Sequence, residues 1–238
     1  MARVLVIGDI HEPATHPGYL AFCRDMRSRW KCEATVFMGD ILDWHSISFH
    51  ASEPSAAGPL DEHTQALEAV KRWHTTFPNS TVTIGNHDAR VTRLAATVNI
   101  PARFLKEYSD IWQTPTWQWV HEYQREGVRY FHGVGSGGKQ PALNAARASM
   151  VSTCAGHYHS CSGVSWTSSS RVRLFGLDAG CGVDIDHPAM RYGSALLKKP
   201  MLGCGVVLDG QEAHWCPMDI QRGGKYHRAR FKKKVRRK

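Results

Sequence analysis

The chain has 238 residues, of which 42% are hydrophobic and 21% charged, as is ordinary for a soluble globular protein with one large or two small domains. No apolar run approaches the roughly 20 residues of a membrane span, so we expect no membrane protein. The net charge of +9 comes from the end of the chain, because residues 225–238 contain nine Lys or Arg and no acid. The remaining 21 basic and 21 acidic residues leave the body of the chain neutral.

Short apolar runs alternate with helical patterns through the first 160 residues. Helices are predicted at 17–30 and 61–77, each from an apolar stripe at helical spacing. Strands of this length alternating with helices predict βαβ units around a largely parallel sheet. The predicted strands are 4–7, 35–38, 81–84, 128–131 and 150–155.

The connecting and C-terminal segments differ from the predicted βαβ units in composition and in hydrophobic pattern. Residues 46–60, rich in Ser, Ala and Pro, predict a loop. Residues 91–127 form a long insertion in which we expect two helices. Its tryptophans, Trp112, Trp117 and Trp119, form either the core of the insertion, which we favour, or a lid that stacks on a base. After residue 160 we expect antiparallel strands in a second sheet, at 162–167, 172–177, 201–208 and 212–218. The predicted organisation is a domain at 1–220 and a basic extension at 221–238.

Seven cysteines, with no C-x-x-C pair and no signal-peptide pattern, predict reduced thiols in a cytoplasmic protein. We expect most of them to act as small buried apolar residues.

Polar side chains follow five of the predicted strands. Because the carboxyl ends of strands in an α/β sheet meet in one crevice, these side chains should converge. Carboxylate, imidazole and amide ligands without thiolate suit Mn²⁺, Fe or Zn²⁺ and argue against a structural zinc site. Seven candidate ligands fit two metals that share a carboxylate, the usual device for displacement at phosphorus. They are Asp9, His11, Asp40, Asn86, His132, His157 and His159.

The ordered set of motifs resembles the calcineurin-like metallophosphoesterase superfamily. The set is D-x-H at 9–11, G-D-x-x-D at 39–43, G-N-H-D at 85–88, H-G at 132–133 and G-H-x-H at 156–159. The resemblance implies a four-layer αββα sandwich with two mixed β-sheets flanked by helices. It also implies two divalent transition metals, with Mn preferred and Fe, Zn or Ni as alternatives.

The same resemblance implies a role for each residue. Asp9, His11 and His159 would bind one metal, Asn86, His132 and His157 the other, and Asp40 both. His87 would protonate the leaving oxygen, and Asp43 would orient His87.

The sequence departs from the protein-phosphatase branch of this family. That branch continues the second motif with Arg-Gly and ends the third in Glu, whereas Trp44, His45 and Asp88 stand here. The phosphate-binding Arg of that branch is therefore missing. Arg90 and Arg93, which share one helical face, are candidate replacements and equally candidate surface residues.

We assign no catalytic or metal-binding role to the remaining polar features. We expect His45, His50, His63 and His74 to lie on the surface or in loops. The segment 135–139 (GSGGK) lacks the spacing of a phosphate-binding P-loop, so we expect a connection rather than a substrate contact.

The sequence leaves the substrate open. We expect phosphodiester hydrolysis, with a weak preference for nucleic acid because the nine cations of 225–238 attract polyanions. A small-molecule or cyclic-nucleotide phosphodiesterase and a phosphomonoesterase remain alternatives. A catalytically dead nucleic-acid-binding module is a further alternative, and the oligomeric state stays undetermined.

Overall fold

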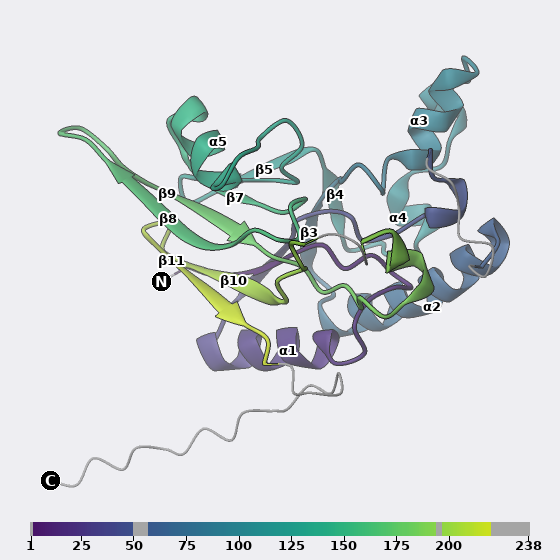
Figure 1. Cartoon of the computed structure of the whole chain (residues 1–238), viewed down its shortest axis with the longest axis horizontal. Helices are drawn as coiled ribbons and strands as arrows, with labels where there is room; N and C mark the ends of the chain where they lie inside the picture. The colour runs from purple at the N-terminus through teal and green to yellow at the C-terminus, as the bar shows by residue number, and fades with distance from the viewer. Residues whose placement is uncertain (1, 50–56, 194–196, 220–238) are drawn as a thin grey trace, which may run out of the picture.

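The computed structural model describes residues 2–49, 57–193 and 197–219, and its two β-sheets lie face to face (Figure 1). One sheet has the strand order β11-β10-β1-β2-β3-β4 and the other β5-β6-β7-β9-β8. Both mix parallel and antiparallel pairs, and helices cover their outer faces. The expected αββα sandwich is therefore confirmed.

The first sheet begins with parallel strands β1 (Arg3–Ile7), β2 (Ala34–Phe37), β3 (Ser80–Thr83) and β4 (Gln118–Val120). Strand β10 (Gly203–Leu208) pairs antiparallel with β1, and β11 (Glu212–Pro217) with β10.

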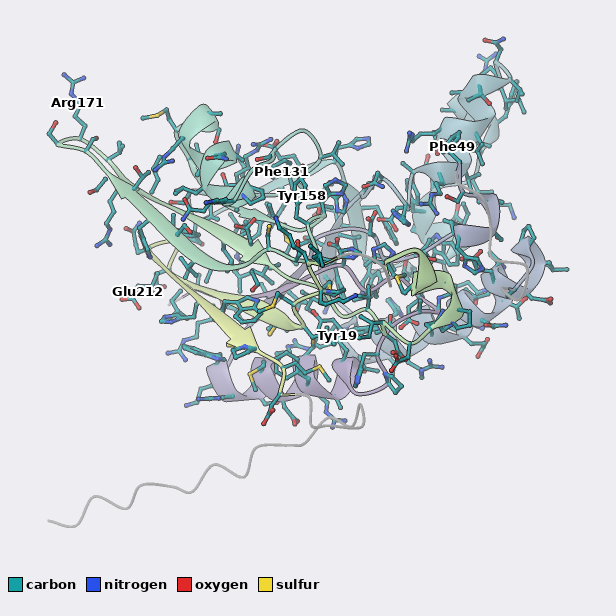
Figure 2. The ribbon with its side chains drawn as sticks, in the orientation of Figure 1. Tyr19, Phe49, Phe131, Tyr158, Arg171 and Glu212 are labelled. Atoms are coloured by element: carbon teal, nitrogen blue, oxygen red, sulfur yellow. The ribbon has the colours of Figure 1, made fainter. Side chains whose placement is uncertain are left out.

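Helices α1 (Tyr19–Trp30) and α2 (Pro59–Thr76) pack on the outer face of this sheet. Leu5 and Ile7 contact this helical layer, because alternate side chains of a strand point to opposite faces. Tyr19, labelled in Figure 2, is fully buried at the start of α1, and its hydroxyl donates to the Gly203 carbonyl of β10 at 2.7 Å. This hydrogen bond fixes the beginning of α1 to the sheet.

The second sheet contains β5 (Glu122–Arg125), β6 (Val128–Phe131), β7 (Ser152–Ala155), β8 (Ser162–Ser168) and β9 (Arg173–Ala179). Helix α5 (Pro141–Ser149) packs against β7 and β9. The other faces of the two sheets meet in a hydrophobic core. Val4 and Val6 of β1 pack there with Tyr130 and Leu177 of the second sheet.

The insertion 91–127 contains most of helix α3 (Arg90–Thr97), the 3₁₀ turn η2 (Ala102–Phe104) and the short helix α4 (Tyr108–Ile111). It also contains β4 and β5, which belong to different sheets. Trp112 and Trp117 are 1% and 4% exposed and Trp119 is partly buried, so packing is confirmed over a lid, although these side chains join the core of the first sheet rather than a core of the insertion. Two further 3₁₀ segments are η1 (His45–Ile47) and η3 (Pro188–Gly193).

Two expectations about the sheets are wrong. Strands β6 and β7 do not extend the first parallel sheet but form the centre of the second. Strands β10 and β11 do not belong to the second sheet but complete the first. The reason is that every central strand of a sandwich is buried on both faces, so hydrophobic patterns locate strands without assigning them to a sheet.

Three elements are not predicted from the sequence. Helix α5 is short and rich in alanine, and Leu143 is its only large apolar residue. Strands β4 and β5 are short, and β5 is polar at the sheet edge.

The cysteines and the ends of the chain complete the description. All seven cysteines are free and six are buried, as expected of small apolar residues. Among the described residues, no helix is both long and apolar enough to cross a membrane. The basic extension 221–238 and His50 lie outside the described residues.

Candidate metal centre

The loops that follow β1, β2, β3, β6 and β7 bring the candidate ligands together. Three of these residues have left-handed backbones, with φ of 52° at His11, 46° at Asp40 and 70° at His157. Such conformations cost energy in residues other than glycine and concentrate at functional sites. Three of the ten described non-glycine residues with positive φ are therefore candidate ligands, and Trp44 is a fourth residue of the same loops.

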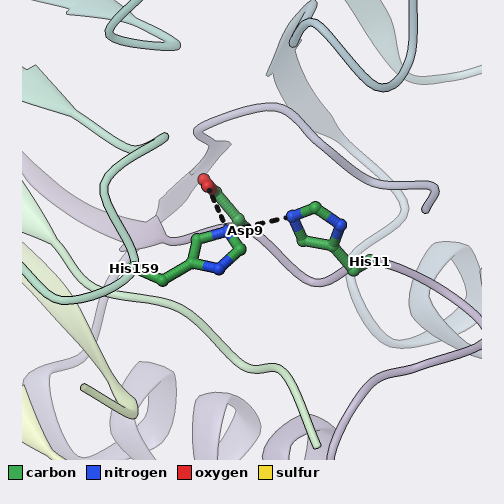
Figure 3. A group of neighbouring side chains, drawn as sticks. All are labelled: Asp9, His11 and His159. Carbon is green, nitrogen blue, oxygen red and sulfur yellow. Dashed lines mark hydrogen bonds and ion pairs between the residues drawn. The ribbon is translucent and has the colours of Figure 1, made fainter. Parts of the chain in front are cut away.

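Asp9, His11 and His159 form the first group of potential ligands (Figure 3). The Nε2 atoms of His11 and His159 lie 3.0 Å apart, and His159 Nε2 is 3.2 Å from Asp9 Oδ2. Asp9 and His11 are fully buried. Two imidazole nitrogens that face each other at this distance, beside a carboxylate, have the arrangement of donors around one shared cation.

Asp40, His132 and His157 form a second group. His132 Nε2 lies 3.2 Å from Asp40 Oδ2 and 2.9 Å from Asn86 Oδ1. The His132 Nδ1–H donates to the Met38 carbonyl at 2.7 Å, which leaves Nε2 as the free ligand atom. The structure thus brings Asn86 to the same group as the two histidines.

Asp40 lies between the two groups, as its expected shared role requires. Its Oδ2 is 3.2 Å from His132 Nε2 and 3.7 Å from His11 Nε2. Burial alone would raise the pKa of Asp40, but the nearby His132 and His87 outweigh it and hold the pKa well below its usual value. The Asp40 carboxylate is therefore ionised, as a metal ligand must be.

The histidines divide by electrostatic environment. Burial lowers the pKa of His132, yet the Asp40 carboxylate outweighs burial and raises this pKa to about 10, so a metal at His132 would have to displace a proton. Burial and the neighbouring His87 lower the pKa of His11, and burial and His132 lower that of His157. His11 and His157 are thus neutral at pH 7, the state in which imidazole binds a metal.

The donor set fits two divalent cations. Asp9 Oδ1 is buried and has no hydrogen-bond partner, so the group contains an acceptor that a positive charge would satisfy. A Cβ on Gly85 would collide with the Asp40 carboxylate, and one on Gly156 with that of Asp9. These two glycines therefore allow the backbone to approach both carboxylates closely.

His87 and Asp43 adjoin this centre. The His87 backbone N–H donates to Asp40 Oδ1 at 2.8 Å, and the ring Nδ1–H donates to the backbone carbonyl of Asp43 at 2.7 Å. The carboxylate of Asp43 is 3.4 Å from His87 Nδ1 but 2.8 Å from His11 Nδ1. Sequence reasoning missed the contact with His11, through which Asp43 holds a metal-ligand candidate as well as His87.

The two candidate substrate-binding arginines lie in different surroundings. Arg90 is 8% exposed, and its Nη1 donates to the carbonyls of Asp43 and Trp44 at 2.7 Å each. Its Nη2 lies 3.2 Å from His87 Nε2. Arg93 is exposed to a larger degree, with its guanidinium over the Phe49 ring at 5.1 Å. Arg90 therefore braces the loop beneath His87, while Arg93 lies on the surface.

Other histidines near the centre vary in their surroundings. The His45 side chain is only 11% exposed and contacts two carboxylates, so a surface position is wrong, although the residue does lie in the connection between β2 and α2. The His63 and Trp112 ring centroids lie 5.1 Å apart, and the half-buried His74 contacts Thr116.

The glycine-rich segment after β6 lies away from the ligand groups. Gly135, Ser136 and Gly137 line a surface groove of about 790 Å³ at the edge of the second sheet, together with residues of β5 and α5.

Asp88 is a structural residue that the motif alone did not explain. Its carboxylate accepts hydrogen bonds from Ile41 N and Gly85 N, both at 2.9 Å. It thereby ties the loop after β2 to the loop after β3. Burial and the nearby Asp40 raise the pKa of Asp88 to about 7.

The family model for calcineurin-like phosphoesterases matches residues 2–187. The chain belongs to this family. The sequence matches no curated protein. Among solved structures, vacuolar protein sorting 29 from Cryptosporidium parvum is 14% identical, with a TM-score of 0.49 over 95% of this chain and 94% of that one.

Two further solved structures resemble the chain. The phosphoesterase YfcE from E. coli is 15% identical, with a TM-score of 0.43 over 86% of this chain and 87% of that one. The nuclease MPE from Pseudomonas putida is 18% identical, with a TM-score of 0.39 over 77% and 74%. Likenesses at these identities concern the fold alone.

Proposed function

We propose that the chain is a two-metal phosphoester hydrolase. The observation that supports it is the convergence of seven carboxylate, imidazole and amide donors at the loops after five strands, with Asp40 between two groups. Asp9, His11 and His159 bind one cation, and Asn86, His132 and His157 the other. Bound there, the pair would supply charge stabilisation at phosphorus and an acidified water. The donor set, which lacks thiolate, suits Mn²⁺, Fe or Zn²⁺, and the family resemblance favours Mn²⁺ among them.

The protein's own groups divide the remaining work. Asp40 holds the two ligand groups in register, and its Oδ1 accepts the N–H that fixes the backbone of His87. His87 delivers a proton to the leaving oxygen, and Asp43 positions both His87 and His11. Arg90 anchors the carbonyls of Asp43 and Trp44, so its contribution to the reaction is to hold that loop still.

We further propose that the substrate is a phosphodiester in a nucleic acid. The second motif lacks the Arg-Gly of the protein phosphatases. The nine cations of residues 225–238, on a neutral body, supply long-range attraction to a polyanion. A cyclic nucleotide would gain little from such a charge.

An activity screen with Mn²⁺ tests this proposal. Substrates are a chromogenic diester, a chromogenic monoester, cyclic nucleotides, and single- and double-stranded DNA and RNA. We expect turnover of the diester and of a polynucleotide, with the polynucleotide reaction falling steeply as salt increases. Turnover confined to the monoester or to cyclic nucleotides would contradict the substrate assignment.

Metal analysis separates the enzyme from a catalytically dead binding module. Purified in the presence of Mn²⁺, the enzyme should retain about two metals in the main centre. A protein that binds nucleic acid but retains no metal would support the module instead.

A further inference from the structure

A second cluster of metal-type donors lies behind the centre already described. It consists of Asp43, His45 and Glu62, which offer one imidazole and two carboxylates within 4.8 Å of one another. Asp43 follows β2, His45 begins η1, and Glu62 lies in the first turn of α2. The cluster is almost closed to solvent, with side-chain exposures of 2% for Asp43, 11% for His45 and 1% for Glu62.

The distances within the cluster suit one shared cation. His45 Nδ1 lies 2.9 Å from Glu62 Oε1 and 3.4 Å from Asp43 Oδ2. Ligand atoms about 2.0–2.2 Å from one metal, at tetrahedral or octahedral angles, are separated by roughly 2.8–3.6 Å. Both separations lie inside this range.

Two atoms of the cluster that lack hydrogen-bond partners also support a shared cation. Although His45 Nδ1 approaches two carboxylate oxygens, it makes a hydrogen bond to neither, and Asp43 Oδ2 has no hydrogen-bond partner. A cation between the three atoms would give both unpartnered atoms a partner.

The unpartnered oxygen of Asp43 can be compared with the carboxylates of the main centre. There, too, a buried carboxylate oxygen, Asp9 Oδ1, has no hydrogen-bond partner. By contrast, where a proton joins an imidazole to a carboxylate, as between His11 Nδ1 and Asp43 Oδ1 at 2.8 Å, a proper hydrogen bond forms. Asp43 Oδ2 therefore resembles Asp9 Oδ1 of the main centre and differs from Asp43 Oδ1, which is hydrogen-bonded.

Backbone N–H groups of η1 hold the Glu62 carboxylate in place. Glu62 Oε1 accepts the backbone N–H of His45 at 2.9 Å, and Glu62 Oε2 accepts that of Ser46 at 3.0 Å. Hydrogen bonds of this kind orient ligating carboxylates. Two buried carboxylates beside one imidazole need positive charge, which either a proton on His45, whose pKa Asp43 and Glu62 raise to about 9, or a divalent cation would supply.

We propose that Asp43, His45 and Glu62 form a third site for a divalent transition metal such as Zn²⁺. The ion ties η1 to the first turn of α2. Asp43 directs one oxygen to His11 and the other to His45, so one carboxylate joins the third site to the main centre. Three protein ligands leave room for a water molecule. This site goes beyond the proposed hydrolysis and does not depend on it.

Zinc stoichiometry of the full chain tests the proposal. The protein is stripped with a chelator, titrated with Zn²⁺, dialysed and analysed for metal per chain. The wild type should bind one equivalent more than His45→Gln, and Glu62→Gln should lose the same equivalent. The matched control is His74→Gln, because His74 lies on the same helix as Glu62, is half-buried and belongs to neither cluster. It should bind as much zinc as the wild type.

Two outcomes overturn the proposal. One is equal zinc content in His45→Gln and His74→Gln. The other needs no variant and so survives a folding failure: the wild type saturates at the main-centre equivalents alone. In an Asp40→Asn background, where the main centre is weakened, the residual zinc should disappear on adding His45→Gln. Absence of hydrolytic activity would refute the proposed function without touching this result.

Discussion

Replacing His87 by alanine isolates the step in which the leaving oxygen gains a proton. The His87 ring is held by the Asp43 carbonyl at 2.7 Å and lies against His11, with ring centroids 4.5 Å apart. Its ring nitrogen lies within 4.8 Å of ligand atoms of His11 and Asp40, but we assign His87 to neither ligand group of the main centre, so the variant should retain both metals. A positioned general acid contributes about 10²–10⁴ in rate, or roughly 3–5 kcal/mol of transition-state stabilisation. Because His87 is already anchored, we expect a reduction toward the upper end with an alkoxide leaving group.

The assay compares two substrates that differ in the basicity of the leaving group. Nitrophenolate departs with little protonation, so the drop in turnover on a nitrophenyl diester should be at least tenfold smaller than on an alkyl diester. Metal content is measured in parallel, and His74→Ala serves as a histidine-removal control outside the site. An equal drop on both substrates would remove His87 from the acid role, and a missing metal would make it a ligand.

Three further predictions address the centre, the basic extension and the second sheet. Asp40→Asn should lower both metal content and turnover by orders of magnitude while circular dichroism shows an intact fold, because one carboxylate faces both ligand groups. Deleting 225–238 should leave hydrolysis of a small diester unchanged but flatten the salt dependence of polynucleotide binding, with the log–log slope falling by ~0.7–0.9 for each phosphate that the extension neutralises in the full chain. Burial raises the pKa of Asp178 from 3.8 to about 6, against the opposing Ala142 N–H. Ionisation of Asp178 therefore penalises the fold as pH rises through this window, and Asp178→Asn should gain up to about 3 kcal/mol in unfolding free energy, relative to the wild type, between pH 4 and pH 7.5.

The ligand groups were predictable because their placement follows from one topological rule. Each candidate needed only to follow an apolar strand, and strand ends converge whichever sheet a strand joins. The assignment of β6, β7, β10 and β11 to sheets was therefore wrong without harming the prediction of the site. His132 and His157 reach Asp40 from the second sheet, across the sandwich.

Side-chain direction is the part that the sequence did not determine. Arg90 and Arg93 share one face of a helix by their spacing alone, yet one is buried against the Asp43 carbonyl and the other lies over Phe49. The loop after β2 causes this difference, because its carbonyls accept hydrogen bonds from Arg90, the first residue of the helix. Likewise, the contact of His45 with Glu62 exists because η1 turns back onto the first turn of α2.

The structure gives Asp43 more contacts than its motif implies. The motif implies one role for Asp43, which is to orient His87. The two oxygens of its carboxylate, however, lie near different histidines. Oδ1 accepts from His11 Nδ1 at 2.8 Å, and Oδ2 lies 3.4 Å from His45 Nδ1. Any substitution of Asp43 therefore disturbs a main-centre ligand, His87 and the cluster around His45 together. A change at His45 leaves the first two contacts in place, so it separates what Asp43 does for the reaction from what it does behind the centre.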